Sequence, residues 1–95
     1  MKASRHYEDW PIEESVKFLN MYLDGVKNTD NKVLCSRIAS SLGRTENAIK
    51  IRVKEVSRIL GGDNEFPLVT PNMISAVDQI IESGKISANR MRLLF

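Results

Sequence analysis

The side chains best suited to bind a ligand lie in the run RTENAIKIRVKEVSRIL, residues 44–60. Apolar residues recur there at intervals of four, three and four, the spacing of one helix face: Ile49, Val53, Val56 and Leu60. The opposite face is polar and cationic with one aliphatic side chain: Asn47, Lys50, Ile51, Lys54 and Arg58. Such a helix is the form that reads the DNA major groove. A basic helix that only faces water has the same pattern. The rest of the sequence must therefore decide between DNA binding and simple solvent exposure.

No residues are spaced for catalysis. The chain has no Ser/His/Asp or Cys/His set, no glycine-rich phosphate loop and no metal-ligand motif, and His6 is its one histidine. Glu13 and Glu14 are adjacent, so on a helix they point about 100° apart. Cys35 is the single cysteine, and we interpret it as a small core residue. We therefore expect no enzyme activity, no cofactor and no metal.

Composition points to one small globular domain. The 95 residues are 42% hydrophobic and 27% charged, and no apolar run approaches the roughly 20 residues that cross a bilayer. The N-terminus has no apolar signal-peptide region, and a lone cysteine fits a reducing compartment. We expect no membrane contact and an intracellular location: the nucleus in a eukaryote, the cytoplasm or nucleoid in a prokaryote.

Positive charge is concentrated in the middle of the chain. The net charge is −1 over residues 1–34, +4 over residues 35–60 and −1 over residues 61–95. A clustered basic face is the electrostatic footprint of a phosphate-binding surface.

Five helices are expected, at residues 11–24, 31–42, 46–60, 71–83 and 88–95. Asp30 or Asn31 can cap the second, Thr45 the third, and Thr70 followed by Pro71 the fourth. Gly43 stands where a helix-turn-helix needs its sharp corner. Between the third and fourth helices, Phe66 and Leu68 are expected to pack against the bundle.

The run GRTENAIK after IASSL, together with Trp10 and the pair Glu13-Glu14, resembles the Myb/SANT family of three-helix DNA-binding domains. The resemblance covers residues 8–60. It implies that Lys50 reads base edges from the third helix.

The chain also departs from that family. The second and third of the family's core tryptophans fall at Cys35 and Val53, and its base-reading asparagines fall at Ile51 and Lys54. The link between the first two helices is also longer. The resemblance therefore implies a sequence preference different from that of Myb repeats.

Two other resemblances point to nucleic acid in different settings. IASSLGRTENAIKIRV is also similar to the helix-turn-helix of sigma-factor region 4. The pattern of Trp10, an aliphatic-Tyr helix and then Leu-Gly-Arg-Thr is similar to a helical module that precedes nuclease domains in some prokaryotic enzymes. The apolar last helix suggests either a piece of a longer protein or a C-terminus that docks Phe95 into the core.

We predict an all-α fold, with a three-helix Myb/homeodomain-like helix-turn-helix core at residues 9–62 and a C-terminal helical extension at residues 63–95. The predicted function is binding of double-stranded DNA, in a transcription regulator or as the DNA-recognition part of a larger protein. The alternative is a SANT-type protein-interaction module. The C-terminal helices could dock a further domain or a homodimer partner.

Site residues follow from this prediction. Base contacts are assigned to Asn47, Lys50, Ile51 and Lys54, with phosphate as a second target for Lys54. Phosphate contacts are assigned to Arg37, Arg44, Thr45 and Arg58. The assignment requires Lys50 and Lys54 to be exposed and not covered by the chain after Gly62.

Overall fold

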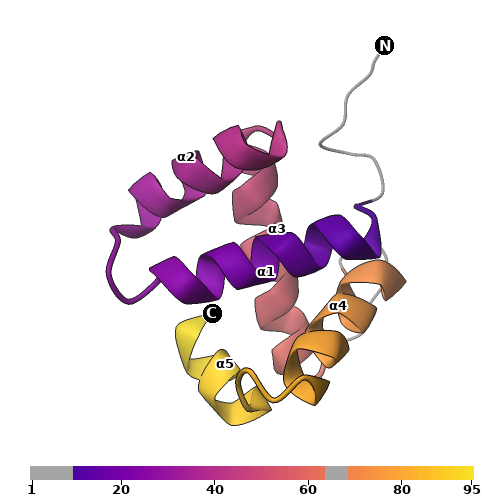
Figure 1. Ribbon diagram of the computed structural model, residues 1–95. Coiled ribbons are helices and arrows are strands. Elements are labelled where there is room, and N and C mark those ends of the chain that lie inside the picture. The colour runs from indigo at the N-terminus through magenta and orange to yellow at the C-terminus, as the bar shows by residue number, and fades with distance from the viewer. Residues whose placement is uncertain (1–9, 64–68) are drawn as a thin grey trace.

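The structure, a computed structural model, describes residues 10–63 and 69–95, which form five helices and no strand (Figure 1). The helices are α1 (Ile12–Gly25), α2 (Asn31–Leu42), α3 (Glu46–Leu60), α4 (Pro71–Glu82) and α5 (Ala88–Leu94). The all-α class is confirmed, and every helix end lies within one residue of its prediction. A Myb/homeodomain-like arrangement of α1–α3 stays a prediction.

Local chemistry explains where α2 and α3 begin and end. The Asp30 carboxylate accepts a hydrogen bond from the Lys32 amide at 3.2 Å, and the Thr45 hydroxyl accepts one from the Ala48 amide at 3.0 Å. Both side chains satisfy amides that a helix start leaves unpaired. Gly43 ends α2 with φ of 70°, a left-handed conformation that glycine adopts without steric cost. This turn directs α3 away from α2.

The start of α4 differs from its prediction. Thr70 is the N-cap residue, but its hydroxyl makes no capping hydrogen bond. Its amide and its hydroxyl instead both donate to Oε2 of Glu55 on α3, each at 2.7 Å. A carboxylate of α3 therefore supplies the cap of α4.

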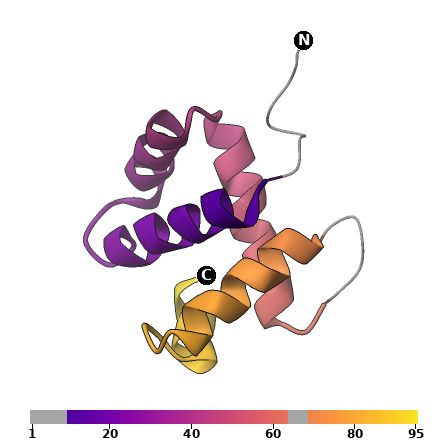
Figure 2. The same ribbon diagram turned by 45° about the vertical axis from the view of Figure 1, so that its right-hand side comes forward.

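One hydrophobic core joins all five helices. Phe18 and Leu19 of α1, Ile49 of α3, Met73 of α4 and Met91 of α5 are each at most 1% exposed. In Figures 1 and 2, α1 crosses in front of α3, and α2 and α5 lie on the same side of α3. The prediction that α4 and α5 extend or buttress the three-helix unit fits this shared core.

The aromatic residues at the two ends of the described chain lie in this core. Trp10 is 3% exposed, as the prediction that it folds back requires, and its ring meets Phe18 edge-on. Phe95 stacks on Tyr22 with a centroid distance of 4.4 Å. The expected packing of Phe66 and Leu68 lies outside the described residues. Within residues 10–63 and 69–95, no helix combines the length and apolar character needed to span a bilayer.

Candidate nucleic-acid interface

The outer face of α3 carries the predicted contact residues. All five members of this face are exposed: Asn47, Lys50, Ile51, Lys54 and Arg58. The inner face buries Ile49, Val56 and Leu60 and half-buries Val53. Lys50 and Lys54 are therefore neither packed away nor covered by α4 or α5, which is the condition that the DNA-binding prediction had to meet.

A groove between α2 and α3 extends this face. Residues of both helices line it: Asn31, Lys32, Cys35, Asn47, Lys50, Ile51, Val53 and Lys54. Its edges thus carry three lysines and two side-chain amides, all hydrogen-bond donors. Lys32 is the addition that sequence reasoning missed. Its place beside Lys50 depends on how α2 packs against α3, although its exposed phase on α2 could have suggested it.

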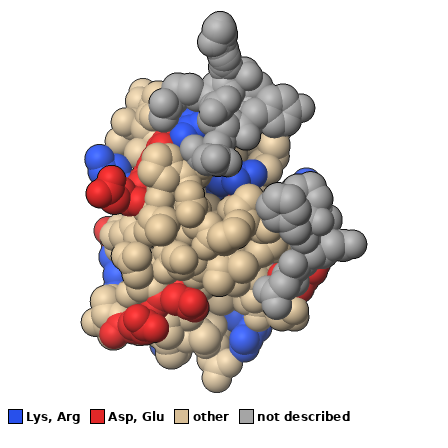
Figure 3. All heavy atoms as spheres, turned by 90° about the vertical axis from the view of Figure 1, so that its right-hand side faces the viewer, with Lys and Arg blue, Asp and Glu red and all other residues tan. Residues whose placement is uncertain are grey.

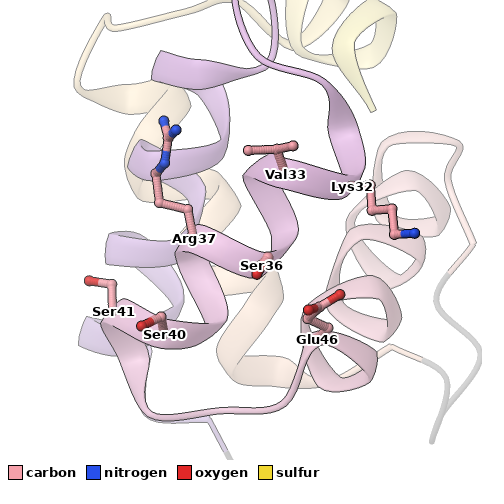
Figure 4. Close-up of a pocket in the computed structure, with 7 residues that line it drawn as sticks. All are labelled: Lys32, Val33, Ser36, Arg37, Ser40, Ser41 and Glu46. Carbon is pink, nitrogen blue, oxygen red and sulfur yellow. The ribbon is translucent and has the colours of Figure 1, made fainter.

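The outer side of α2 contributes less than expected. Figure 4 shows that Lys32 lies on the side of α2 nearest α3, whereas the Arg37 side chain points away from α3. Arg37 is exposed and shares a neighbouring hollow with Lys32, but it does not line the groove of Lys50 and Lys54. Glu46, in the first turn of α3, adds a negative charge to this surface.

Arg44 requires a correction. Its guanidinium forms a bidentate ion pair with the Glu14 carboxylate, with N···O distances of 2.7 and 2.8 Å. The Arg44 side chain is 1% exposed. It also lies over the Trp10 ring at 4.4 Å from the centroid. The expected phosphate contact is not supported, because the charge is buried and balanced inside the protein. Arg44 ties the turn between α2 and α3 to α1.

The two remaining phosphate candidates are exposed. Thr45 lies at the N-terminal end of α3, where its hydroxyl already accepts the Ala48 amide. Arg58 lies in the last turn of α3, with one guanidinium nitrogen 3.7 Å from the Asp63 carboxylate. That loose, solvent-exposed pair reduces the positive potential of Arg58 without removing it.

Cys35 forms the apolar floor of the groove. It is 2% exposed, and its thiol donates to the Asn31 side-chain oxygen at 3.3 Å. Burial raises the pKa of the Cys35 thiol, and the nearby Lys50 opposes that effect in smaller measure. The thiol is therefore neutral at pH 7, which agrees with its interpretation as a core residue.

A different surface lies around α4. Figure 3 views the molecule from the side of α4, where most of the visible surface is uncharged and acidic side chains gather at the lower left. Basic side chains do not dominate this face as they do the α2–α3 groove. The visible part of this face thus carries acidic as well as basic side chains.

No three of the His, Cys, Asp and Glu residues in the described part of the chain gather as metal ligands would. No protein-family model, curated protein or solved structure matches the chain, so the resemblance to Myb/SANT domains stays a prediction.

Proposed function

We propose that this chain binds double-stranded DNA by placing the outer face of α3 in the major groove. One observation carries the proposal: Asn47, Lys50 and Lys54 are exposed together on the helix whose opposite side is buried in the core. An α-helix is about 10–12 Å wide with its side chains, and the major groove is about 12 Å wide. The proposal includes an intracellular role in transcription regulation or as the recognition part of a larger protein.

Each exposed group has a chemical partner on DNA. Lys50 can donate to guanine O6 and N7, Asn47 can pair with adenine N6 and N7, and Ile51 can contact the methyl group of thymine. Lys32 at the start of α2 and Arg58 in the last turn of α3 would hold phosphates, which fixes the register of α3 on the duplex. Lys54 lies between them, within reach of either a base edge or a phosphate.

A protein partner is the competing reading of the same face. Ile51 is 40% exposed and Val33, on the outer side of α2, is 48% exposed. Exposed aliphatic side chains are what a SANT-type protein-interaction module would present. The cationic residues around Ile51 favour DNA, because an apolar partner would have to desolvate them.

The deciding experiment measures duplex affinity at several salt concentrations. Three to four phosphate contacts predict a log–log slope of about −3 to −4, at about −0.9 for each contact. Lys50→Ala should change the preferred base at one position, by about 1–3 kcal/mol in discrimination. Lys54→Ala should weaken binding, and a uniform loss across sequences would identify a phosphate contact.

Lys17→Ala is the matched control, because Lys17 is exposed on α1, away from the groove. It removes the same charge and should leave the slope unchanged. If the unmodified chain shifts no duplex at low salt, the DNA proposal is wrong and the protein-interaction alternative takes its place. An equal loss from Lys17→Ala and Lys54→Ala would show that only net charge matters.

A further inference from the structure

Arg92 of α5 reaches the C-terminal end of the proposed recognition helix. Its Nε donates to the Leu60 carbonyl oxygen, the last of α3, at 2.9 Å. One of its terminal nitrogens donates to the Asn89 side-chain oxygen at 2.7 Å. The residue is nevertheless exposed. The Arg92 guanidinium is therefore held at the C-terminal end of α3, and some of its N–H donors face solvent.

Helix α5 lies on the same side of α3 as α2, the helix that lines the groove together with α3. In both Figure 1 and Figure 2, α2 lies next to the first half of α3 and α5 lies next to its last turn, on the same side. Helices α2 and α5 thus lie on one side of α3, near its two ends. Arg90 is the contrasting residue, since two positions on a helix differ by about 200° and so direct it to the opposite side of α5.

The C-terminal end of α3 would attract phosphate more strongly with an additional cation. The last carbonyls of a helix carry partial negative charge, which repels phosphate. Arg58, in the same turn, shares its charge with Asp63. Arg92 bonds directly to the Leu60 carbonyl and offsets both effects. Without it, the C-terminal end of α3 would bind a phosphate backbone poorly.

We infer that Arg92 is a phosphate contact that α5 adds to the DNA interface, an inference that rests on the proposed function. A guanidinium has five N–H donors, and the bonds to Leu60 and Asn89 use two of them. Those two bonds also fix the plane of the group before DNA arrives, so less rotamer entropy is lost on binding. The interface then spans α2, α3 and α5.

The test compares salt slopes of duplex binding for the full chain and for Arg92→Gln, Arg92→Lys and Arg90→Gln. Arg92→Gln should lower the magnitude of the slope by about 0.9, the value of one lost phosphate contact. Arg92→Lys keeps the charge and should keep most of the slope. Arg90→Gln removes the same charge from the other side of α5 and should leave the slope unchanged.

A merely structural role for Arg92 predicts a different result. If its only task were to cap α3, Arg92→Gln would lower thermal stability but leave the slope as it is, and this outcome would overturn the inference. Should Arg92→Gln fail to fold, the Nε–H signals of the unmodified chain decide. The Nε–H signal of Arg92 should shift when duplex is added, while that of Arg90 should not move. An Arg92 signal that does not shift would refute the contact. Absence of duplex binding by the unmodified chain would refute the proposed function itself.

Discussion

At the scale of single residues, Glu14 and Arg44 hold the turn between α2 and α3 against α1 through a buried ion pair. The Arg44 side chain is 1% exposed and that of Glu14 is 14% exposed. Attraction between the two charges offsets the cost of removing them from water only while both are present. The Trp10 ring beneath the guanidinium adds a cation–π contact.

Glu14→Gln should therefore destabilise the protein strongly. The substitution removes the carboxylate that makes both hydrogen bonds with the buried Arg44 guanidinium described above, for which we expect a loss of about 3 kcal/mol in the free energy of unfolding. Urea denaturation measures it as a lower midpoint with an unchanged m-value. Glu13→Gln is the matched control, since Glu13 is exposed on the same helix turn and should change stability by less than about 0.5 kcal/mol. Equal effects of the two substitutions would show that the ion pair has no special weight.

The role of Arg44 shows what the sequence left open at this scale. Helical spacing separates the exposed Lys50 and Lys54 from the buried Ile49, because phase is a local property. Arg44 lies in the turn, outside any helical phase, and its partner Glu14 is 30 residues earlier. A cation beside a basic helix reads as a phosphate contact until the tertiary fold shows that a carboxylate meets it. Lys32 was missed for the same reason, since the contact between α2 and α3 brings it to the groove.

At the scale of elements, the link between α3 and α4 depends on Glu55. This residue is 1% exposed, accepts two hydrogen bonds from Thr70 and pairs with Arg52 at 2.8 Å. The carboxylate also lies at the N-terminal end of α4, where the helix dipole favours negative charge. Helices α3 and α4 are thus joined through the Glu55 side chain.

Thr70→Val should weaken this link without changing side-chain shape. The hydroxyl bond to a carboxylate is lost, and hydrogen bonds to charged groups contribute about 1.5–3 kcal/mol, so we expect a loss of about 2 kcal/mol in unfolding free energy. Thermal unfolding followed by circular dichroism gives the measurement. Thr29→Val, in the turn before α2, serves as control and should change stability by less than about 0.5 kcal/mol. A loss no larger than that of the control would mean that the Thr70 amide and Arg52 suffice to satisfy the Glu55 carboxylate.

Among the features of the elements, the helix boundaries were the ones that the sequence predicted best. The side chains of Asp30, Thr45 and Ser87 each accept a hydrogen bond from a backbone amide two or three residues later. The signal for these helix starts is therefore local in the sequence. Glu55 carries no such signal, because an isolated glutamate on a basic helix is normally exposed. Its burial follows from the arrival of the α4 N-terminus, which only the packed structure reveals.

At the scale of the whole molecule, α4 and α5 belong to the same core as the three helices before them. Met73, Val77 and Ile80 of α4 and Met91 of α5 are buried in one cluster with Phe18 and Ile49. The boundary predicted between residues 62 and 63 therefore does not separate two hydrophobic cores among the described residues. Domains with one core generally unfold in a single cooperative step.

Met91→Ala tests whether α5 takes part in that step. Met91 is 0% exposed, and truncation of a buried methionine should cost about 3 kcal/mol in unfolding free energy. Trp10 is the one tryptophan and precedes the N-terminal end of α1, whereas α5 lies beside its C-terminal end (Figure 1). A cooperative molecule should lower the midpoint seen by Trp10 fluorescence as much as the midpoint seen by circular dichroism.

Leu93→Ala supplies the control on the same helix, because Leu93 is 85% exposed and should change either midpoint by less than about 0.5 kcal/mol. An α5 that frays by itself would give the opposite pattern to cooperative unfolding. Met91→Ala would then remove a little helical signal while the Trp10 transition stayed in place. Since Arg92 is proposed to hold phosphate at the end of α3, a cooperative result would also mean that the core which buries Met91 is what keeps Arg92 in position.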